Sequence, residues 1–225
     1  MRAYDVPVQE REFELSPDFS IASLDDDRMK QRTLSKAQRA GLSQEDYIAM
    51  LGKVWDRRSE VPNKISEVAR MASAVEAPML SHDDTRADTR GYFRNLGASV
   101  AEFPMVMEAV EAARKHGDLI ILGAPNAARG GSHIGSIGAA DMVEAGLCDA
   151  LASDYFYPAM LAAIDRLDRE KRADRATLWS LLSSGPARAM RLNDRGSITI
   201  GSRADLVLVD WTKGQAPVIE GTWIA

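Results

Sequence analysis

The chain has 225 residues, of which 45% are apolar and 27% are charged, fractions that are ordinary for a globular protein. The net charge of −5 gives no reason to expect nucleic acid or an anionic membrane surface as a partner. The single cysteine, Cys148, excludes a disulfide within the chain, and no apolar run reaches the ~18 residues of a membrane span. We therefore expect a soluble, cytoplasmic protein.

Helices dominate the first third of the chain. Residues 19–24 form a short β-type run that ends in three aspartates, and residues 28–40 are polar and either irregular or helical. Ser43 and Asp46 have the spacing of a capping box, which predicts the start of a helix, and Pro62 begins another. These predicted helices contain no pattern typical of catalysis.

From residue 77 onwards, short apolar strands alternate with helices. Strands are predicted at residues 78–81, 98–102, 119–122 and 148–152, and helices at 87–96, 105–116, 139–145, 157–168 and 176–184. This alternation predicts an α/β fold with a parallel sheet that is buried on both faces. The tail differs, because residues 196–200, 204–209 and 218–224 predict a small antiparallel β unit.

Potential metal ligands and acid–base groups follow the predicted strands, at the end where parallel α/β proteins place their active sites. They are His82 and Asp83, Glu102, the loop that holds His133, and Asp154. Neutral imidazole and carboxylates suit zinc, manganese or iron, and an open coordination position would activate water. The alternative interpretation is that carboxylates such as Asp83 only cap the helices that follow.

A glycine-rich loop follows the third predicted strand of this region. It contains the candidate substrate-binding residues Asn126, Arg129, Gly130, Gly131, Ser132 and His133. Consecutive glycines let backbone N–H groups point into a concave nest that suits phosphate, and Arg129 can add a bidentate contact. Gly-Gly-Ser also occurs in loops without function, so the position of this loop between two strands is what favours a phosphate site.

Two stretches near the end of the chain resemble the closing signature of the amidohydrolase superfamily: SGPARA (184–189) and GSITIGSRADLVLVD (196–210). Four earlier segments are SHDDT (81–85), AEFP (101–104), GAPNAARGGSH (123–133) and EAGLCDALASDY (144–155). They resemble the phosphonate-degradation branch of that superfamily, the α-D-ribose 1-methylphosphonate 5-triphosphate diphosphatases. The resemblance implies a metal-dependent (β/α)8 barrel with a small β-sandwich, and hydrolysis that releases pyrophosphate from a 5-triphosphate.

The resemblance also implies roles for individual residues. His82 resembles the metal-binding histidine that ends barrel strand five, and Glu102 lies at the end of strand six. Asp154 resembles the strand-eight aspartate that binds metal and takes a proton from the attacking water, and Asp27 stands where the family has a histidine. The implied cofactor is a divalent metal, zinc or else iron or manganese. The implied substrate is a small phosphorylated sugar, held by the glycine-rich loop and by Asp83.

The chain departs from this family in having no HxH pair, and its strands match the second half of a barrel. We therefore expect the C-terminal portion of a diverged member: a truncated product, a fragment or half of a split protein. Residues 1–192 would form the partial barrel and residues 193–225 the small β unit. An open barrel edge favours a homo-oligomer or a partner chain. Two alternatives stay open: an amidohydrolase acting on a C–N bond of a small molecule, and a non-catalytic half-barrel that needs a partner.

Overall fold

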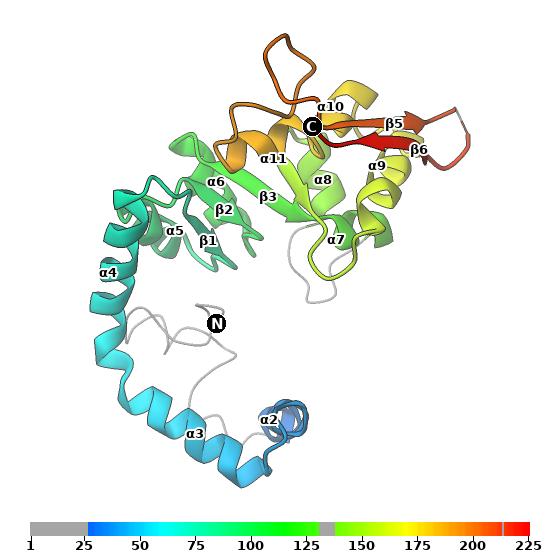
Figure 1. The fold of residues 1–225 in the computed structure, drawn as a ribbon. Helices are drawn as coiled ribbons and strands as arrows, with labels where there is room; N and C mark the ends of the chain where they lie inside the picture. Colours follow the sequence, from blue (N-terminus) through cyan, green and yellow to red (C-terminus); the bar gives the residue numbers. More distant parts are fainter. Residues whose placement is uncertain (1–26, 131–137, 213) are drawn as a thin grey trace. The chain divides into compact units, whose positions relative to one another are not determined.

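The computed structural model describes residues 27–130, 138–212 and 214–225 (Figure 1). The chain divides into two compact units, one with the described residues up to Met71 and the other from Ala72 to Ala225. Gly131, Ser132 and His133 of the glycine-rich loop and the predicted run at residues 19–24 lie outside the described residues. The boundary expected near residue 192 stays a prediction.

The first unit is helical, as the sequence predicts. Its elements are α2 (Asp27–Ala40), α3 (Gln44–Asp56), the 3₁₀ turn η3 (Arg58–Glu60) and most of α4 (Val61–Ala74). The predicted capping box begins α3, because the Ser43 hydroxyl accepts a hydrogen bond from the N–H of Asp46 at 3.0 Å and donates to its carboxylate at 2.7 Å. None of the described helices is long and apolar enough to cross a membrane.

The second unit is built on a four-stranded parallel sheet (Figure 1). Its strands lie in chain order: β1 (Leu80–His82), β2 (Val100–Glu102), β3 (Leu119–Gly123) and β4 (Ala150–Ala152). The connecting helices are α5 (Ala87–Asn95), α6 (Met107–Lys115), α7 (Ala124–Arg129) and α8 (Ala139–Glu144). The predicted βαβ alternation is therefore confirmed, and all four carboxyl ends meet at one edge of the sheet.

The two faces of this sheet pack against different clusters. One face contributes Ala101, Ile120, Leu122 and Leu151 to a large apolar core, which the surrounding helices complete. The other face contributes Val100, Ile121 and Ala150 to a smaller cluster that includes Ala189. His82 pairs in register with Glu102, Glu102 with Ile121, and Ile121 with Ala150. Since these residues form one row across the sheet, His82 and Glu102 point to the face with the smaller cluster.

In the described residues, three helices and a two-stranded sheet follow β4. They are α9 (Ala159–Arg169), α10 (Arg175–Ser180), α11 (Ser184–Ala189), β5 (Leu206–Asp210) and β6 (Val218–Trp223), and the last two pair antiparallel (Figure 1). The strand predicted at residues 196–200 is wrong. Ile198 and Ile200 are almost fully exposed, so their alternating pattern has no apolar surface on which to pack.

Helix α7 lies where the sequence predicted a loop. Pro125 is at the start of this helix, where the N–H that proline lacks has no helical partner. Gly130 ends the helix with a left-handed φ of 87°. Of the motif GAPNAARGGSH, Gly123 ends β3 and residues 124–129 form α7. The glycine-rich part of the motif therefore begins at Gly130, after the helix.

Candidate functional site

The carboxyl edge of the parallel sheet contains unusual backbone conformations. Asp83 follows β1 with φ 58°, Phe103 follows β2 with φ 53°, and Asp154 lies two residues after β4 with φ 51°. Left-handed backbone at residues other than glycine costs about 1–3 kcal/mol each and concentrates at functional sites, where the surrounding structure holds it in place. The same edge carries the side chains that the sequence predicts to be functional.

His82 and Glu102 lie side by side at the ends of β1 and β2. Nε2 of His82 is 4.0 Å from Oε2 of Glu102, and the side chains are 27% and 28% exposed, so both can be reached by a bound ion or substrate. On the other side of the ring, Nδ1 is 3.1 Å from Oδ2 of Asp83. The ring also packs edge-on against Phe103, with 5.1 Å between the centroids. Asp83 and Phe103 therefore restrict the orientation of the imidazole.

The other predicted metal ligands belong to other elements: Asp154 follows β4, which is two strands away from β2 in the sheet, and Asp27 belongs to the first unit. Asp154 is exposed in the turn after β4, and Asp27 is the first residue of α2, for which the backbone alone is described. Among the side chains that the structure describes, no three or more of His, Cys, Asp or Glu are placed to hold a metal ion. Imidazole and carboxylate are ligands that zinc accepts, so His82 and Glu102 fit such an ion and supply two of the ~four ligands it needs.

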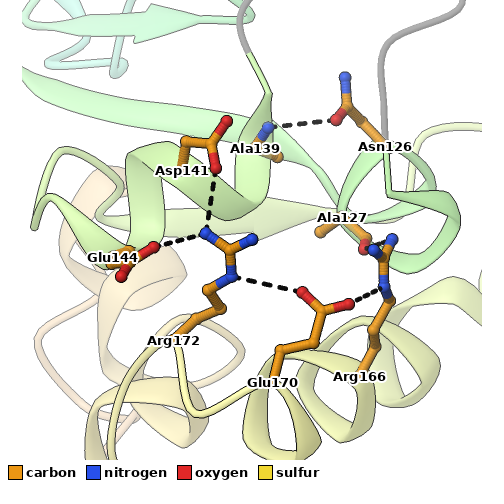
Figure 2. Close-up of polar contacts among 8 residues, drawn as sticks. All are labelled: Asn126, Ala127, Ala139, Asp141, Glu144, Arg166, Glu170 and Arg172. Carbon is orange, nitrogen blue, oxygen red and sulfur yellow. Dashed lines mark hydrogen bonds and ion pairs between the residues drawn. The ribbon is translucent and has the colours of Figure 1, made fainter.

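Part of the predicted phosphate loop is described, and its residues have contacts within the protein. Oδ1 of Asn126 accepts a hydrogen bond from the N–H of Ala139 at 3.1 Å, which joins α7 to the first residue of α8 (Figure 2). Nη1 of Arg129 donates to the hydroxyl of Tyr155 at 2.9 Å, next to Asp154. Arg129 and the turn after β4 therefore lie together, whereas Asn126 holds the helices on either side of residues 131–137.

Helix α9 supports α7 through an arginine that the sequence analysis did not single out. Arg166 donates to the carbonyl oxygen of Ala127 at 3.2 Å and pairs with Glu170 at 2.6 Å (Figure 2). A Cβ atom on Gly130 would displace the Arg166 guanidinium, and the positive φ at this position favours glycine. Arg172 adds contacts to Glu170 and to two carboxylates of α8, Asp141 and Glu144.

A buried carboxyl lies directly behind His82. Asp84 is fully buried, and burial raises the pKa of its carboxyl, while the hydrogen bond from Ser81 and the charge of Arg90 act in the opposite direction. Burial also disfavours the charged form of Arg90, and it therefore lowers the pKa of that guanidinium. The sequence suggests a helix cap for a carboxylate at this position, but the residue that precedes α5 is Arg86. Asp84 instead belongs to an ionic cluster inside the fold.

The chain is similar in sequence to a known enzyme. Over 167 residues the chain is 39% identical to the α-D-ribose 1-methylphosphonate 5-triphosphate diphosphatase of Escherichia coli (strain K12). The match covers 73% of this chain and 43% of the relative, so the chain spans less than half the length of that protein.

Solved structures and a family model also match the chain. An uncharacterised protein has a TM-score of 0.50 at 17% identity, over 65% of this chain and 42% of its own. L-hydantoinase (dihydropyrimidinase) from Arthrobacter aurescens has a TM-score of 0.49 at 15% identity, over 66% and 51%. The fold is a portion of an α/β barrel followed by a small antiparallel sheet. The model of the amidohydrolase family matches residues 56–220, most of the chain, and the protein therefore belongs to this family.

Proposed function

We propose that this chain carries part of the site of a metal-dependent hydrolase that releases pyrophosphate from a small sugar 5-triphosphate. The observation that carries the proposal is the pair His82 and Glu102 on one face of the sheet, 4.0 Å apart at the carboxyl edge. Family membership and the 39% identity to a diphosphatase support hydrolysis and this substrate class. The position of Arg129 beside the turn of Asp154 adds a cation close to the same edge.

In this proposal His82 and Glu102 hold a divalent metal, which is zinc or else iron or manganese, and Asp154 is a further ligand. When bound, such a metal polarises a phosphoryl oxygen and makes water a nucleophile at neutral pH. Asp154 accepts the proton of the attacking water, and its exposed position leaves room for a substrate.

The phosphate groups of the substrate would contact Arg129. A guanidinium has five N–H donors, and Arg129 uses Nη1 to donate to the hydroxyl of Tyr155. Because the side chain is exposed and held at the sheet edge, other donors can form a bidentate pair with a phosphate. Asp83, predicted to bind substrate, would instead orient His82, since its carboxylate lies 3.1 Å from Nδ1 of that ring.

We also propose that a second copy or a partner chain covers the β1 side of the sheet. In the described residues β1 pairs with β2 alone, whereas the outer side of β4 is covered where the N–H of Leu151 donates to the carbonyl of Leu181 at 2.9 Å. An unpaired strand edge is a template for another chain. Light scattering would test this proposal, and a monomer that retains metal and activity would contradict it.

Elemental analysis of purified chain, reconstituted with zinc, iron or manganese, tests the metal site. We expect about one ion or more per chain in the wild type, and its loss in His82→Ala. His116→Ala is the matched control, because His116 is an exposed residue at the end of α6 and should leave the metal content unchanged. Absence of metal in the reconstituted wild type would overturn the proposal.

A substrate panel tests the reaction itself. Pyrophosphate should appear with sugar 5-triphosphates and should not appear with the corresponding monophosphates. Hydrolysis of small cyclic amides without pyrophosphate release would show instead that the chain acts on C–N bonds.

A further inference from the structure

A buried ionic cluster lies behind the strand ends that carry His82 and Glu102. Its members are Ser81, Asp84, Arg90 and Asp118, and none of them is more than 2% exposed. Charged side chains are almost never buried to this extent unless they are paired. The reaction proposed above uses none of the four, so their burial at this place needs a separate reason.

Asp84 joins three elements next to the carboxyl edge. Its Oδ2 accepts a hydrogen bond from the Ser81 hydroxyl of β1 at 2.5 Å and lies 3.5 Å from Nη1 of Arg90 in α5. Its backbone carbonyl accepts the N–H of Met105, in the turn after β2, at 3.0 Å. The turn that follows His82 is therefore fixed both to its own strand and to the neighbouring turn.

Arg90 connects the same region to the approaches of β2 and β3. Nη1 donates to the Ser81 hydroxyl and to the carbonyl of Val100 at 3.3 Å, and Nη2 donates to the carbonyl of Ala98. Nε lies 3.2 Å from Oδ2 of Asp118, directly before β3. The planar guanidinium presents its donors in a rigid fork, so one side chain fixes the positions of β1 and β2 relative to each other.

We infer that Asp84 and Arg90 are positioning residues for His82 and Glu102, and hence for the divalent metal; the inference rests on the proposed function. Because side chains alternate along a strand, Ser81 points to the helix-covered face while His82 points to the opposite one. The ionic cluster therefore holds the backbone of β1 and β2 from the helix-covered face, opposite to the face that carries His82 and Glu102. A shift of either strand end changes the 4.0 Å separation between Nε2 of His82 and Oε2 of Glu102.

Asp149, next to β4, is the centre of a second ionic cluster that serves for comparison. Asp149, directly before β4, accepts the N–H of Ile120 at 2.8 Å and pairs with Arg114 at 2.7 Å and Arg188 at 3.0 Å. It joins strands and helices of the same sheet, but at the amino edge, away from His82 and Glu102. Loss of this cluster should weaken the fold without moving the proposed ligands.

The experiment compares Asp84→Asn and Arg90→Lys with Asp149→Asn in the full chain. Asp84→Asn keeps an oxygen for Ser81 and removes the charge, while Arg90→Lys keeps the charge and removes the fork. Zn²⁺ affinity is measured by titration calorimetry at a temperature where circular dichroism shows every variant folded. Amide hydrogen exchange of residues 80–105 is measured on the metal-free protein.

We expect Zn²⁺ affinity to fall about 10- to 100-fold in Asp84→Asn and Arg90→Lys, with faster exchange in residues 80–105. Asp149→Asn should unfold at a lower temperature and keep wild-type affinity. Should Asp84→Asn fail to fold, Ser81→Ala removes the link between β1 and Asp84 alone and should also lower the affinity.

Wild-type affinity in folded Asp84→Asn and Arg90→Lys would overturn the inference and leave the proposed function standing. An equal loss of affinity in Asp149→Asn would also overturn it, because general destabilisation would then explain the effect. If the wild-type chain binds no Zn²⁺, the proposed function fails first, and the inference fails with it.

Discussion

Cys148 lies just before β4, and its thiol donates to the carbonyl of Ala150 at 3.3 Å. Although part of the residue reaches solvent, desolvation raises the pKa of the thiol to about 12, and the charge of Asp149 adds to this effect. Thiolate is the reactive form, so we predict that iodoacetamide at pH 8 modifies native Cys148 about 1,000-fold more slowly than an ordinary cysteine peptide.

Mass spectrometry of the alkylated fraction over time measures this rate. The same chain in urea should react like the peptide, which makes it an internal control. Fast alkylation of the folded chain would show that the turn before β4 is more open than the structure has it.

Gly185 in α11 is a second residue whose surroundings determine the effect of a substitution. A Cβ atom there would collide with the backbone carbonyl of Asp149, which cannot move aside without shifting the strand that follows. We predict that Gly185→Ala destabilises the fold by about 1–3 kcal/mol in urea unfolding. Gly91→Ala in α5 is the control, because nothing lies within 4 Å of its Cβ, and it should be neutral or stabilising by up to ~1 kcal/mol.

At the scale of elements, the attachment of the β5–β6 sheet depends on Arg175 at the start of α10. Its guanidinium lies 4.6 Å from the centroid of the Trp211 ring, and it donates to the carbonyl of Trp211 at 2.6 Å and to Asp168 of α9 at 2.8 Å. A two-stranded sheet is marginally stable without such support.

Arg175→Ala should therefore speed amide hydrogen exchange in residues 206–223 by at least about tenfold, while β3 keeps its protection. Arg203→Ala is the matched control, since Arg203 is exposed and donates to the carbonyl of Ala225 at 2.8 Å. Equal exchange in Arg175→Ala and the wild type would mean that other contacts hold the small sheet.

Hydrophobic periodicity and capping residues predicted most of the helices and strands, because both signals depend on residues close together in the sequence. The Ser43 capping box and the strands ending at His82 and Glu102 were located from sequence to within a few residues. The prediction of a strand at residues 196–200 was wrong, because an alternating pattern does not reveal whether a neighbouring strand or core surface is available for packing. Helix α7 was missed because glycine and proline around it read as a loop.

The part of the candidate site that was predictable from sequence is the part that lies at the strand ends. His82 and Glu102 end β1 and β2, and neighbouring parallel strands end at the same edge of the sheet, so the sequence predicted that the two side chains lie close together. The inward position of Arg90 was not predictable, since an arginine on an amphipathic helix ordinarily faces solvent. Its burial depends on Asp84, which follows β1, and on Asp118, which precedes β3.

At the scale of the whole molecule, the β5–β6 sheet leaves most of its large apolar side chains exposed. Six of them are at least 38% exposed and only Val209 is less so; the six are Leu206, Val207, Leu208, Val218, Ile219 and Trp223. Large apolar side chains that stay exposed on both strands of one sheet are typical of a surface on which a partner packs. We therefore predict self-association of the chain through this sheet.

Size-exclusion chromatography with light scattering should give a molar mass above the 24.6 kDa of one chain, rising with concentration. Leu208→Lys combined with Ile219→Lys should shift this mass toward the monomer, because lysine on an exposed sheet blocks edge-to-edge and face-to-face pairing. Val68→Lys is the control, since Val68 of α4 is 63% exposed, slightly more than Leu208 at 56% and Ile219 at 53%, and lies outside the β5–β6 sheet. A wild-type monomer at ~100 µM, or an oligomer that the double variant leaves unchanged, would exclude this sheet as the interface.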